Sequence, residues 1–209
     1  MKIFLTLLPA LLLSCSAGAQ TNVQLPAPDG VKTVKMTLMQ ALQKRHSTRE
    51  YNTSKTITDR TLSNLLWAAC GYNRPEEKRI TAPSALNTQD ILVYVCRKDG
   101  AYRYDPDANS LVQVSSEDLR PAVAHRQDFA KSAPVCLVLV SDQGKFRQPN
   151  IEMGALDAGY VSQNICLAAT AIGLATVPRA TMDKEALAKG LGLTENQVPL
   201  LNHPVGWPK

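Results

Sequence analysis

Apolar residues recur at the spacing of an α-helix in four segments, so that one side of each predicted helix is apolar. These segments are residues 36–44, 58–71, 150–172 and 183–189. Thr58 and Asp183 are typical N-cap residues, and Gly71 and Gly173 stand where the second and third helices should end. The third segment is about 20 residues long and apolar over much of its circumference, which predicts a central, buried helix. Small residues at positions 154, 158 and 162 would let another backbone approach it closely.

Apolar or alternating runs predict four strands: residues 91–96, 101–105, 111–114 and 135–140. The last run is continuously apolar, which is typical of a strand covered on both faces. Ser115 or Ser116 is expected to cap a further helix that runs to about Gln127. Thr194 and Gln197 have the spacing of a capping box for a last short turn. The length that follows residue 19, about 190 residues, is ample for one domain with a sizeable core.

Residues 1–19 have the features of an export signal. Lys2 precedes an apolar core, residues 3–13, which is too short to span a membrane, and small residues follow. Cleavage after Ala19 is the favoured interpretation, and a lipid anchor on Cys15 is the alternative. Residues 20–36 would then form an N-terminal arm or linker, and residues 37–209 the domain. In a bacterium, the protein would be periplasmic or associated with the outer membrane.

Charge and cysteine spacing argue against two classes of partner. The formal net charge is +5, but the positive residues are scattered and form no basic stripe with interleaved aromatic residues. We therefore expect no nucleic-acid partner. Four cysteines lie in apolar runs without metal-ligand spacing: Cys70, Cys96, Cys136 and Cys166. This favours buried free thiols and no metal site, although an exported chain could also form disulfides.

Residues 45–51, Arg-His-Ser-Thr-Arg-Glu-Tyr, follow the first predicted helix. If this segment is extended, Arg45, Ser47, Arg49 and Tyr51 point to one face, and the two arginines attach about 13 Å apart. Guanidinium groups are always charged and offer forked donors, so this spacing suits a long anionic ligand with a phosphate. The alternative interpretation is a solvated basic helix end that complements the helix dipole.

Residues 82–89 predict a polar loop before the strand at residues 91–96. Proline, serine and asparagine are typical turn residues, which gives the loop a purely structural interpretation. Loops that lead into strands also carry ligand-binding groups on a rigid scaffold. The amides of Asn87 and Gln89 can both donate and accept hydrogen bonds, and Ser84 adds a hydroxyl group.

Several short motifs occur in an order that resembles the nitroreductase family of FMN-dependent oxidoreductases. They are Arg45-x-Ser47-x-Arg49-x-Tyr51, Pro83-Ser84-x-x-Asn87-x-Gln89, Asp157-Ala158-Gly159 with Gly173-Leu174, Val177-Pro178, and the terminal Gly206-Trp207-Pro208-Lys209. The resemblance spans residues 37–209. Two departures are Asp90, where many members continue with Pro-Trp, and Lys209, which is the only basic residue after the terminal proline.

The resemblance implies the fold, the cofactor and the oligomer. We expect an α+β fold with a mainly antiparallel central sheet flanked by helices and a long buried central helix, in a homodimer whose two FMN sites use both subunits. The implied FMN-binding residues are Arg45, His46, Ser47, Arg49 and Lys209 at the phosphate, Ser84, Asn87 and Gln89 at the ring, and Pro178, Arg179 and Ala180 along the flavin. A backbone N–H near Ala180 would reach flavin N5.

The implied function is that of an exported FMN-dependent oxidoreductase, which passes hydride through flavin N5 from a reduced donor to a small nitroaromatic, quinone or similar acceptor. This chemistry needs no catalytic side chain. Glu152 and Asp157 do not supply an acid/base pair, because positions five residues apart lie about 140° apart around a helix. Two alternatives stay open: a secreted protein that binds a ligand or partner without turnover, and an azoline-type dehydrogenase.

Overall fold

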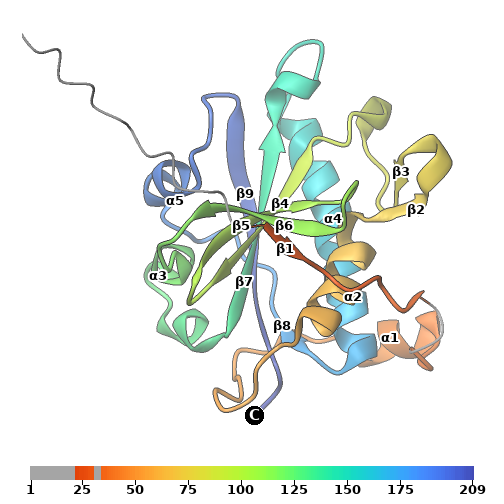
Figure 1. Ribbon diagram of the computed structural model, residues 1–209, viewed down its shortest axis with the longest axis vertical. Helices are drawn as coiled ribbons and strands as arrows, with labels where there is room; N and C mark the ends of the chain where they lie inside the picture. Colours follow the sequence, from red (N-terminus) through yellow and green to blue (C-terminus); the bar gives the residue numbers. More distant parts are fainter. Residues whose placement is uncertain (1–21, 31–33) are drawn as a thin grey trace, which may run out of the picture.

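The computed structural model describes residues 22–30 and 34–209. Five α-helices are seen in these ranges: α1 (Leu38–Lys44), α2 (Asp59–Cys70), α3 (Arg120–Ala124), α4 (Ile151–Ile172) and α5 (Lys184–Leu191). The strands are β1 (Asn22–Gln24), β2 (Tyr72–Arg74), β3 (Arg79–Ile80), β4 (Ile91–Arg97), β5 (Gly100–Asp105), β6 (Ser110–Ser115), β7 (Val135–Asp142), β8 (Ala175–Thr176) and β9 (Gln197–Gly206). Seven strands form one antiparallel sheet in the order β1-β6-β5-β4-β7-β9-β8, and β2 and β3 form a separate ribbon (Figure 1).

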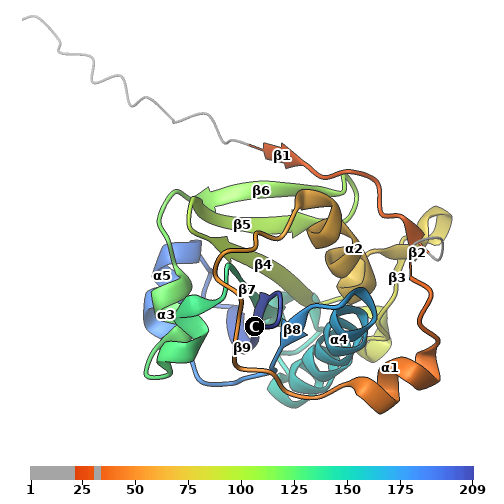
Figure 2. The same cartoon turned by 90° about the horizontal axis from the view of Figure 1, so that it is seen from below.

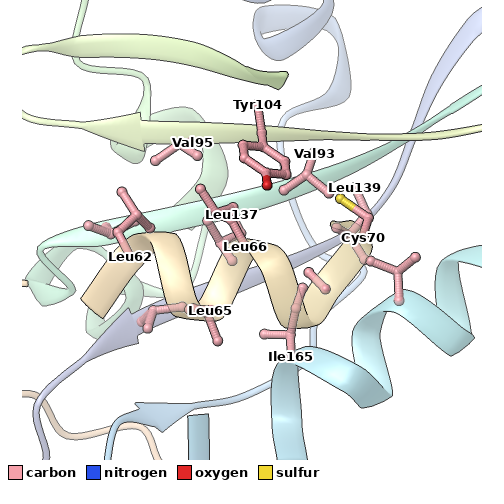
Figure 3. Close-up of a cluster of buried hydrophobic side chains, with 14 of the residues drawn as sticks. Leu62, Leu65, Leu66, Cys70, Val93, Val95, Tyr104, Leu137, Leu139 and Ile165 are labelled. Atoms are coloured by element: carbon pink, nitrogen blue, oxygen red, sulfur yellow. The ribbon is translucent and has the colours of Figure 1, made fainter. Parts of the chain in front are cut away.

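The sheet separates two layers of helices. Figure 2 shows α2 and α4 on one side and α3 and α5 on the other. Alternate residues of β7 therefore enter two different cores: Leu137 and Leu139 pack towards α2 and α4, whereas Val138 and Val140 pack towards α3 and α5. Figure 3 shows the first core, where the leucines of α2 and Ile165 of α4 converge on the sheet. The predicted α+β fold with a doubly covered central strand is confirmed.

Helix α4 begins and ends as the sequence predicts. The Asn150 side chain accepts a hydrogen bond from the Met153 amide, and Gly173 ends the helix with a left-handed φ of 80°. A Cβ atom added to Gly154 would collide with the side chain of Ser141 on β7, so the predicted close approach is present there. The helix is buried only on its sheet side, because apolar side chains of its N-terminal half remain exposed.

Three segments differ from the sequence prediction. The helix expected up to Gln127 is only the five residues of α3, because β6 continues to Ser115 and Pro121 stands in the first turn. Thr194 and Gln197 form a turn that leads into β9 and not into a helix. Strand β9, which pairs with β7 along its length, was not predicted because two prolines and the polar residues Asn202 and His203 interrupt its apolar pattern.

The remaining sequence predictions have mixed outcomes. The four cysteines outside the N-terminal region are free and buried, as predicted. Residues 22–24 of the expected arm form the edge strand β1. The export signal and Cys15 lie outside the described residues. No helix in the described ranges is long and apolar enough to cross a membrane.

His203 on β9 gives the fold a predicted sensitivity to acid. Its ring is fully buried between the hydroxyl groups of Ser162 and Thr176, at 2.8 and 3.3 Å, and burial lowers its pKa to about 3. Between pH 6.5 and 3 the unfolded chain therefore takes up a proton that the folded chain excludes, so stability falls as the pH falls. The loss from this group between pH 7.5 and 4.5 should be about 2.5 kcal/mol.

Urea unfolding of the wild type and of His203→Gln at both pH values tests this. Glutamine cannot titrate, so the variant should lose less stability on acidification even if it is less stable at pH 7.5. Every other titrating group is common to both proteins. The same loss in both would show that His203 does not cause the acid sensitivity.

Candidate functional site

Residues 45–51, which we call the Arg45 segment, are fixed against the edge of the sheet. The Thr48 amide donates to the Thr176 carbonyl at 3.0 Å. The buried Tyr51 hydroxyl lies 3.1 Å from the Thr48 carbonyl and 3.3 Å from the Pro204 carbonyl. Tyr51 is thus an anchor and not part of a ligand-facing row. The fixed backbone holds the polar side chains of the segment at the C-terminal end of α4.

The two arginines of this segment are available to bind a ligand. Arg45 and Arg49 form no hydrogen bond or ion pair with any of the residues described, although Arg49 lies 5.9 Å from the centre of the Phe129 ring. Ser47 and Arg49 are exposed and Arg45 is half-buried. His46 lies in a different place: with Lys44, Thr48 and Pro208 it lines a hollow of ≈ 240 Å³. The segment therefore presents donor groups on two sides, a suitable arrangement for an anion.

The turn after β8 also lies at this end of the molecule. Pro178 and Ala180 are exposed, and within the described ranges no hydrogen bond is made by the Ala180 N–H. The Arg179 guanidinium points inward, donating to the side chains of Gln127 and Asn202, both at 2.8 Å, and to two backbone carbonyls of α3. Its backbone also pairs with Asn202. Arg179 thus positions the turn, and the turn offers a ligand its backbone groups.

Residues 83–89, which we call the Ser84 loop, have a strained backbone. Leu86, Asn87 and Gln89 have positive φ angles of 51°, 55° and 49°, a conformation uncommon outside glycine. The Ser84 hydroxyl accepts from the Gln89 amide at 3.0 Å, and Lys145 donates to the Gln89 carbonyl at 2.7 Å. Such strain persists only where surrounding contacts fix it, and it is often found at ligand-binding loops.

A buried pair of carboxyl groups holds this loop on α4. Both carboxylate oxygens of Asp157 accept from the Ala85 amide, at 3.0 and 2.9 Å. Asp90, at the end of the loop, is fully buried and accepts from the Ser141 hydroxyl. Burial raises the pKa of Asp90 to about 6, and its hydrogen bond to the Asp157 carboxyl raises it too, whereas the Ser141 hydrogen bond lowers it. Asp90 therefore takes up a proton at a higher pH than an exposed carboxyl group does.

Sequence reasoning did not find this pair. In the sequence, Asp90 is a departure from one family motif, and Asp157 belongs to another motif and is rejected as an acid/base partner of Glu152. The structure agrees with the rejection of that second pairing, since Glu152 is exposed and Asp157 is buried. The available signal was the occurrence of two acids next to apolar runs, where a carboxylate needs a partner.

The predicted site residues form two groups that are far apart in one chain. The Arg45 segment and the turn at residues 178–180 lie near the C-terminal end of α4, where Thr170 lines the hollow beside His46. The Ser84 loop binds Asp157 in the N-terminal half of the helix. Thirteen residues separate Asp157 from Thr170, which is about 20 Å along a helix. One chain therefore does not bring Ser84, Asn87 and Gln89 to Arg45.

An exposed apolar face runs between the two groups. Eight large apolar side chains are exposed on α1, on the Ser84 loop and on the N-terminal half of α4: Leu38, Met39, Leu42, Leu86, Ile151, Met153, Leu156 and Tyr160. We call this set the α1–α4 face, and Figure 2 shows the two helices side by side. Leu86 is 94% exposed and Leu156 is 56% exposed. An apolar patch formed by two helices and a loop is typical of a protein contact surface.

Comparisons with known proteins agree on one family. The model of the Nitroreductase family matches residues 42–207. A protein of Methanocaldococcus jannaschii, described as a "putative nitroreductase", is 32% identical over 202 residues, which cover 90% of this chain and 98% of that protein. A crystal structure from Ralstonia eutropha, also described as a "putative nitroreductase", superposes with a TM-score of 0.83 at 35% identity and covers 90% of each chain.

A more distant likeness concerns the fold alone. A chain in the structure of the Escherichia coli microcin synthetase McbBCD complex, solved with truncated pro-MccB17 bound, superposes with a TM-score of 0.70 at 19% identity. The match covers 100% of this chain and 85% of that one.

The attachment of the Ser84 loop to Asp157 can be tested by removing the carboxylate. Asp157→Ala leaves the half-buried Ala85 N–H without its acceptor, which should lower the free energy of unfolding by about 1–3 kcal/mol. The Ala85 amide should also exchange its hydrogen at least about tenfold faster. Glu152→Ala, an exposed change on the same helix, should alter neither quantity. Unchanged exchange at Ala85 in Asp157→Ala would contradict the role assigned to this carboxylate.

Proposed function

This chain belongs to the nitroreductase family, and we propose that it is an FMN-dependent oxidoreductase that passes hydride from a reduced donor to a small nitroaromatic, quinone or similar acceptor. The observation that carries the proposal is a group of hydrogen-bond donors near one end of α4: the guanidinium groups of Arg45 and Arg49 and the N–H of Ala180. Among the residues described, two guanidinium groups without a hydrogen bond or ion pair stand near a turn whose exposed Ala180 N–H has no acceptor, and Arg49 and Arg179 both lie against the Phe129 ring.

This donor set fits a phosphorylated flavin. Arg45, Ser47 and Arg49 would bind the phosphate, with His46 and the exposed Lys209 beside them. Residues 178–180 would lie along the ring, with the Ala180 N–H as a hydrogen-bond donor to N5. When bound, the flavin supplies the hydride chemistry, while the protein supplies orientation and hydrogen-bond donors. A backbone donor at this position needs no particular side chain, which is consistent with the inward orientation of Arg179.

The distance between the two residue groups supports a homodimer as the functional unit. If two copies pack through their α1–α4 faces with their α4 helices antiparallel, the Ser84 loop of each copy approaches the Arg45 segment of the other. Ser84, Asn87 and Gln89 could then bind the ring edge across the interface. A two-fold axis brings the same patch of both copies together. One exposed apolar face on each chain is therefore enough to form the interface. The same packing would bury Leu86 and Leu156.

We also propose that the protein is exported, and this rests only on the export-signal features of residues 1–19. The protein would be periplasmic or attached to the outer membrane, with Cys15 as the lipid anchor if cleavage occurs before it. Pyridine nucleotides are cytoplasmic, so an exported enzyme would draw on another donor, such as a quinol or a thiol system.

Two other functions are compared with the proposed reductase: an azoline-type dehydrogenase and a non-catalytic binding protein. An azoline-type dehydrogenase would run the flavin chemistry in the opposite direction, and the superposition on a chain of the microcin synthetase complex is consistent with it at the level of the fold. A non-catalytic binding protein could hold an anion with the same donors, and membership of the nitroreductase family is what favours the oxidoreductase over it. The reductase therefore remains the main proposal.

Flavin retention is the first test. Protein lacking residues 1–19, incubated with FMN and freed of excess flavin, should retain about one flavin per chain that dithionite bleaches. Arg45→Ala should weaken FMN binding at least about tenfold, since a charge-assisted hydrogen bond to phosphate is lost. Arg60→Ala is the control, because Arg60 pairs with Asp29 on the exposed side of α2.

Both variants should unfold at the temperature of the wild type. Equal flavin retention in Arg45→Ala and the wild type would contradict the phosphate site. A wild-type protein without flavin would leave the non-catalytic function as the better explanation.

The proposed dimer interface can be tested by introducing a charged side chain on the α1–α4 face. Leu156→Glu should convert dimers into monomers in sedimentation velocity experiments, because a buried, unpaired carboxylate is costly. The monomers should also lose flavin, since each site would lack the partner's Ser84 loop. Ala186→Glu places the same group on exposed α5 and should leave the dimer intact. A wild type that is monomeric at micromolar concentration, or a Leu156→Glu variant that stays dimeric, would rule out this interface.

A further inference from the structure

A hollow of ≈ 310 Å³ lies between the β2–β3 ribbon and the Ser84 loop. The ribbon contributes Arg74, Glu77 and Arg79 to its walls, and the loop contributes Ser84 and Asn87. The hollow thus adjoins two residues that the proposed function places at the flavin ring. No motif or comparison assigns a role to the ribbon arginines.

The two arginines are directly opposite each other in the ribbon. Arg74 on β2 is the cross-strand partner of Arg79 on β3. Like charges at such positions repel each other and destabilise a strand pair. A ribbon of only two short strands has little other pairing to offset this repulsion. An anion between the two guanidinium groups would turn the repulsion into attraction.

Within residues 22–30 and 34–209, neither arginine has a strong protein partner. The Arg79 Nε atom is 3.8 Å from a Glu77 carboxylate oxygen, and both side chains are largely exposed. The Arg74 Nε atom is 3.5 Å from the Asn73 side-chain oxygen, at the limit of a hydrogen bond. By contrast, Lys78 between them forms a 2.8 Å ion pair with Asp107 and does not line the hollow. Arg74 and Arg79, the two cations that line the hollow, are therefore available to bind a ligand.

The loop side of the hollow adds neutral donors. The Ser84 oxygen accepts from the Gln89 amide, which leaves its hydroxyl hydrogen free to donate. The Asn87 side-chain oxygen lies 3.3 Å from the Gln89 side-chain nitrogen that donates to it, so the Asn87 NH₂ group remains available. Glu77 is the one acidic side chain among the lining residues. The free groups of the hollow are thus mainly hydrogen-bond donors.

We propose that this hollow is a subsite for the carboxylate of the substrate, so that the enzyme prefers acceptors with a carboxylate group on a small planar ring. The proposal rests on the proposed function, which places the Ser84 loop beside the flavin. A carboxylate matches the forked donors of a guanidinium, and two arginines hold it by charge as well as by geometry. The neutral part of the substrate would then extend over the loop towards the ring.

Binding of a matched pair of probes tests the subsite. 4-Nitrobenzoate and 4-nitrobenzamide have nearly the same shape and differ in charge, and calorimetric titration into the FMN-loaded protein gives a Kd for each. The wild type should bind nitrobenzoate at least about tenfold more tightly. This preference should weaken when the salt concentration is raised from about 50 to about 500 mM, because the arginines are exposed.

Arg74→Gln/Arg79→Gln should lose at least about tenfold in affinity for nitrobenzoate and less than about twofold for nitrobenzamide. Lys78→Gln removes the same charge from the same ribbon and should keep the preference. Equal affinities in the wild type would overturn the subsite, and so would a preference that persists in the double variant. A uniform loss for both probes would also overturn it, because that result indicates altered structure and not recognition of charge.

The flavin absorbance of the same samples separates this proposal from the proposed function. Retained flavin without a preference for nitrobenzoate would overturn the subsite alone. Protein without flavin would overturn the proposed function, and titration of the flavin-free protein with the same two probes would still decide whether the arginines select a carboxylate.

Discussion

The close approach of α4 to the sheet is the constraint on which the other features depend. A side chain at Gly154 would collide with Ser141, and further along the same row Ser162 forms a hydrogen bond with buried His203 on β9. These contacts fix the depth and rotation of the helix. Because Asp157 lies on this helix, they also fix the Ser84 loop at one end. At the other end, the Thr176 carbonyl after α4 holds the Thr48 amide of the Arg45 segment. One rigid helix thus sets the distance between both groups of site residues.

That distance explains why the site is not complete in one chain. A helix is stiff, so groups about 20 Å apart along it cannot be brought together by a local movement. Either the ligand is long or a second chain contributes. The α1–α4 face favours the second explanation, because exposed side chains such as Leu86 and Leu156 gain stability only when another surface covers them. The proposed flavin site and the proposed dimer therefore depend on each other.

The sequence predicts the elements whose signals are local. The helix starts at Thr58 and Asp183 are predicted from residue type, and each of these side chains caps its helix by accepting a backbone hydrogen bond. The family resemblance covers nearly the same residues as the family match. Strand β9 was missed because its partner β7 compensates for prolines that would exclude a strand on local grounds. A strand in the middle of a sheet depends on distant pairing, which is not visible in the strand's own sequence.

Sequence prediction is limited in a similar way for the side chains of the site. A motif identifies which residues occur together, but it does not give the direction in which a side chain points. Arg179 stands in the predicted flavin turn, yet its guanidinium is directed into the protein, where Asn202 and the carbonyls of α3 accept its hydrogen bonds. Tyr51 is likewise an anchor. The pair of Asp90 and Asp157 joins residues 67 positions apart, so neither residue predicts the other.

The strained Ser84 loop links the monomer to the proposed dimer. A left-handed backbone at residues such as Leu86 costs about 1–3 kcal/mol per residue, and the Asp157 carboxylate offsets only part of this cost through the Ala85 amide. With this backbone, the Leu86 side chain stands in solvent at 94% exposure. Burial of one leucine contributes about 1.5–3 kcal/mol, which is of the size needed to offset the strain at that residue. In the proposed dimer, the same strain therefore serves both the interface and the ligand-binding position of Asn87.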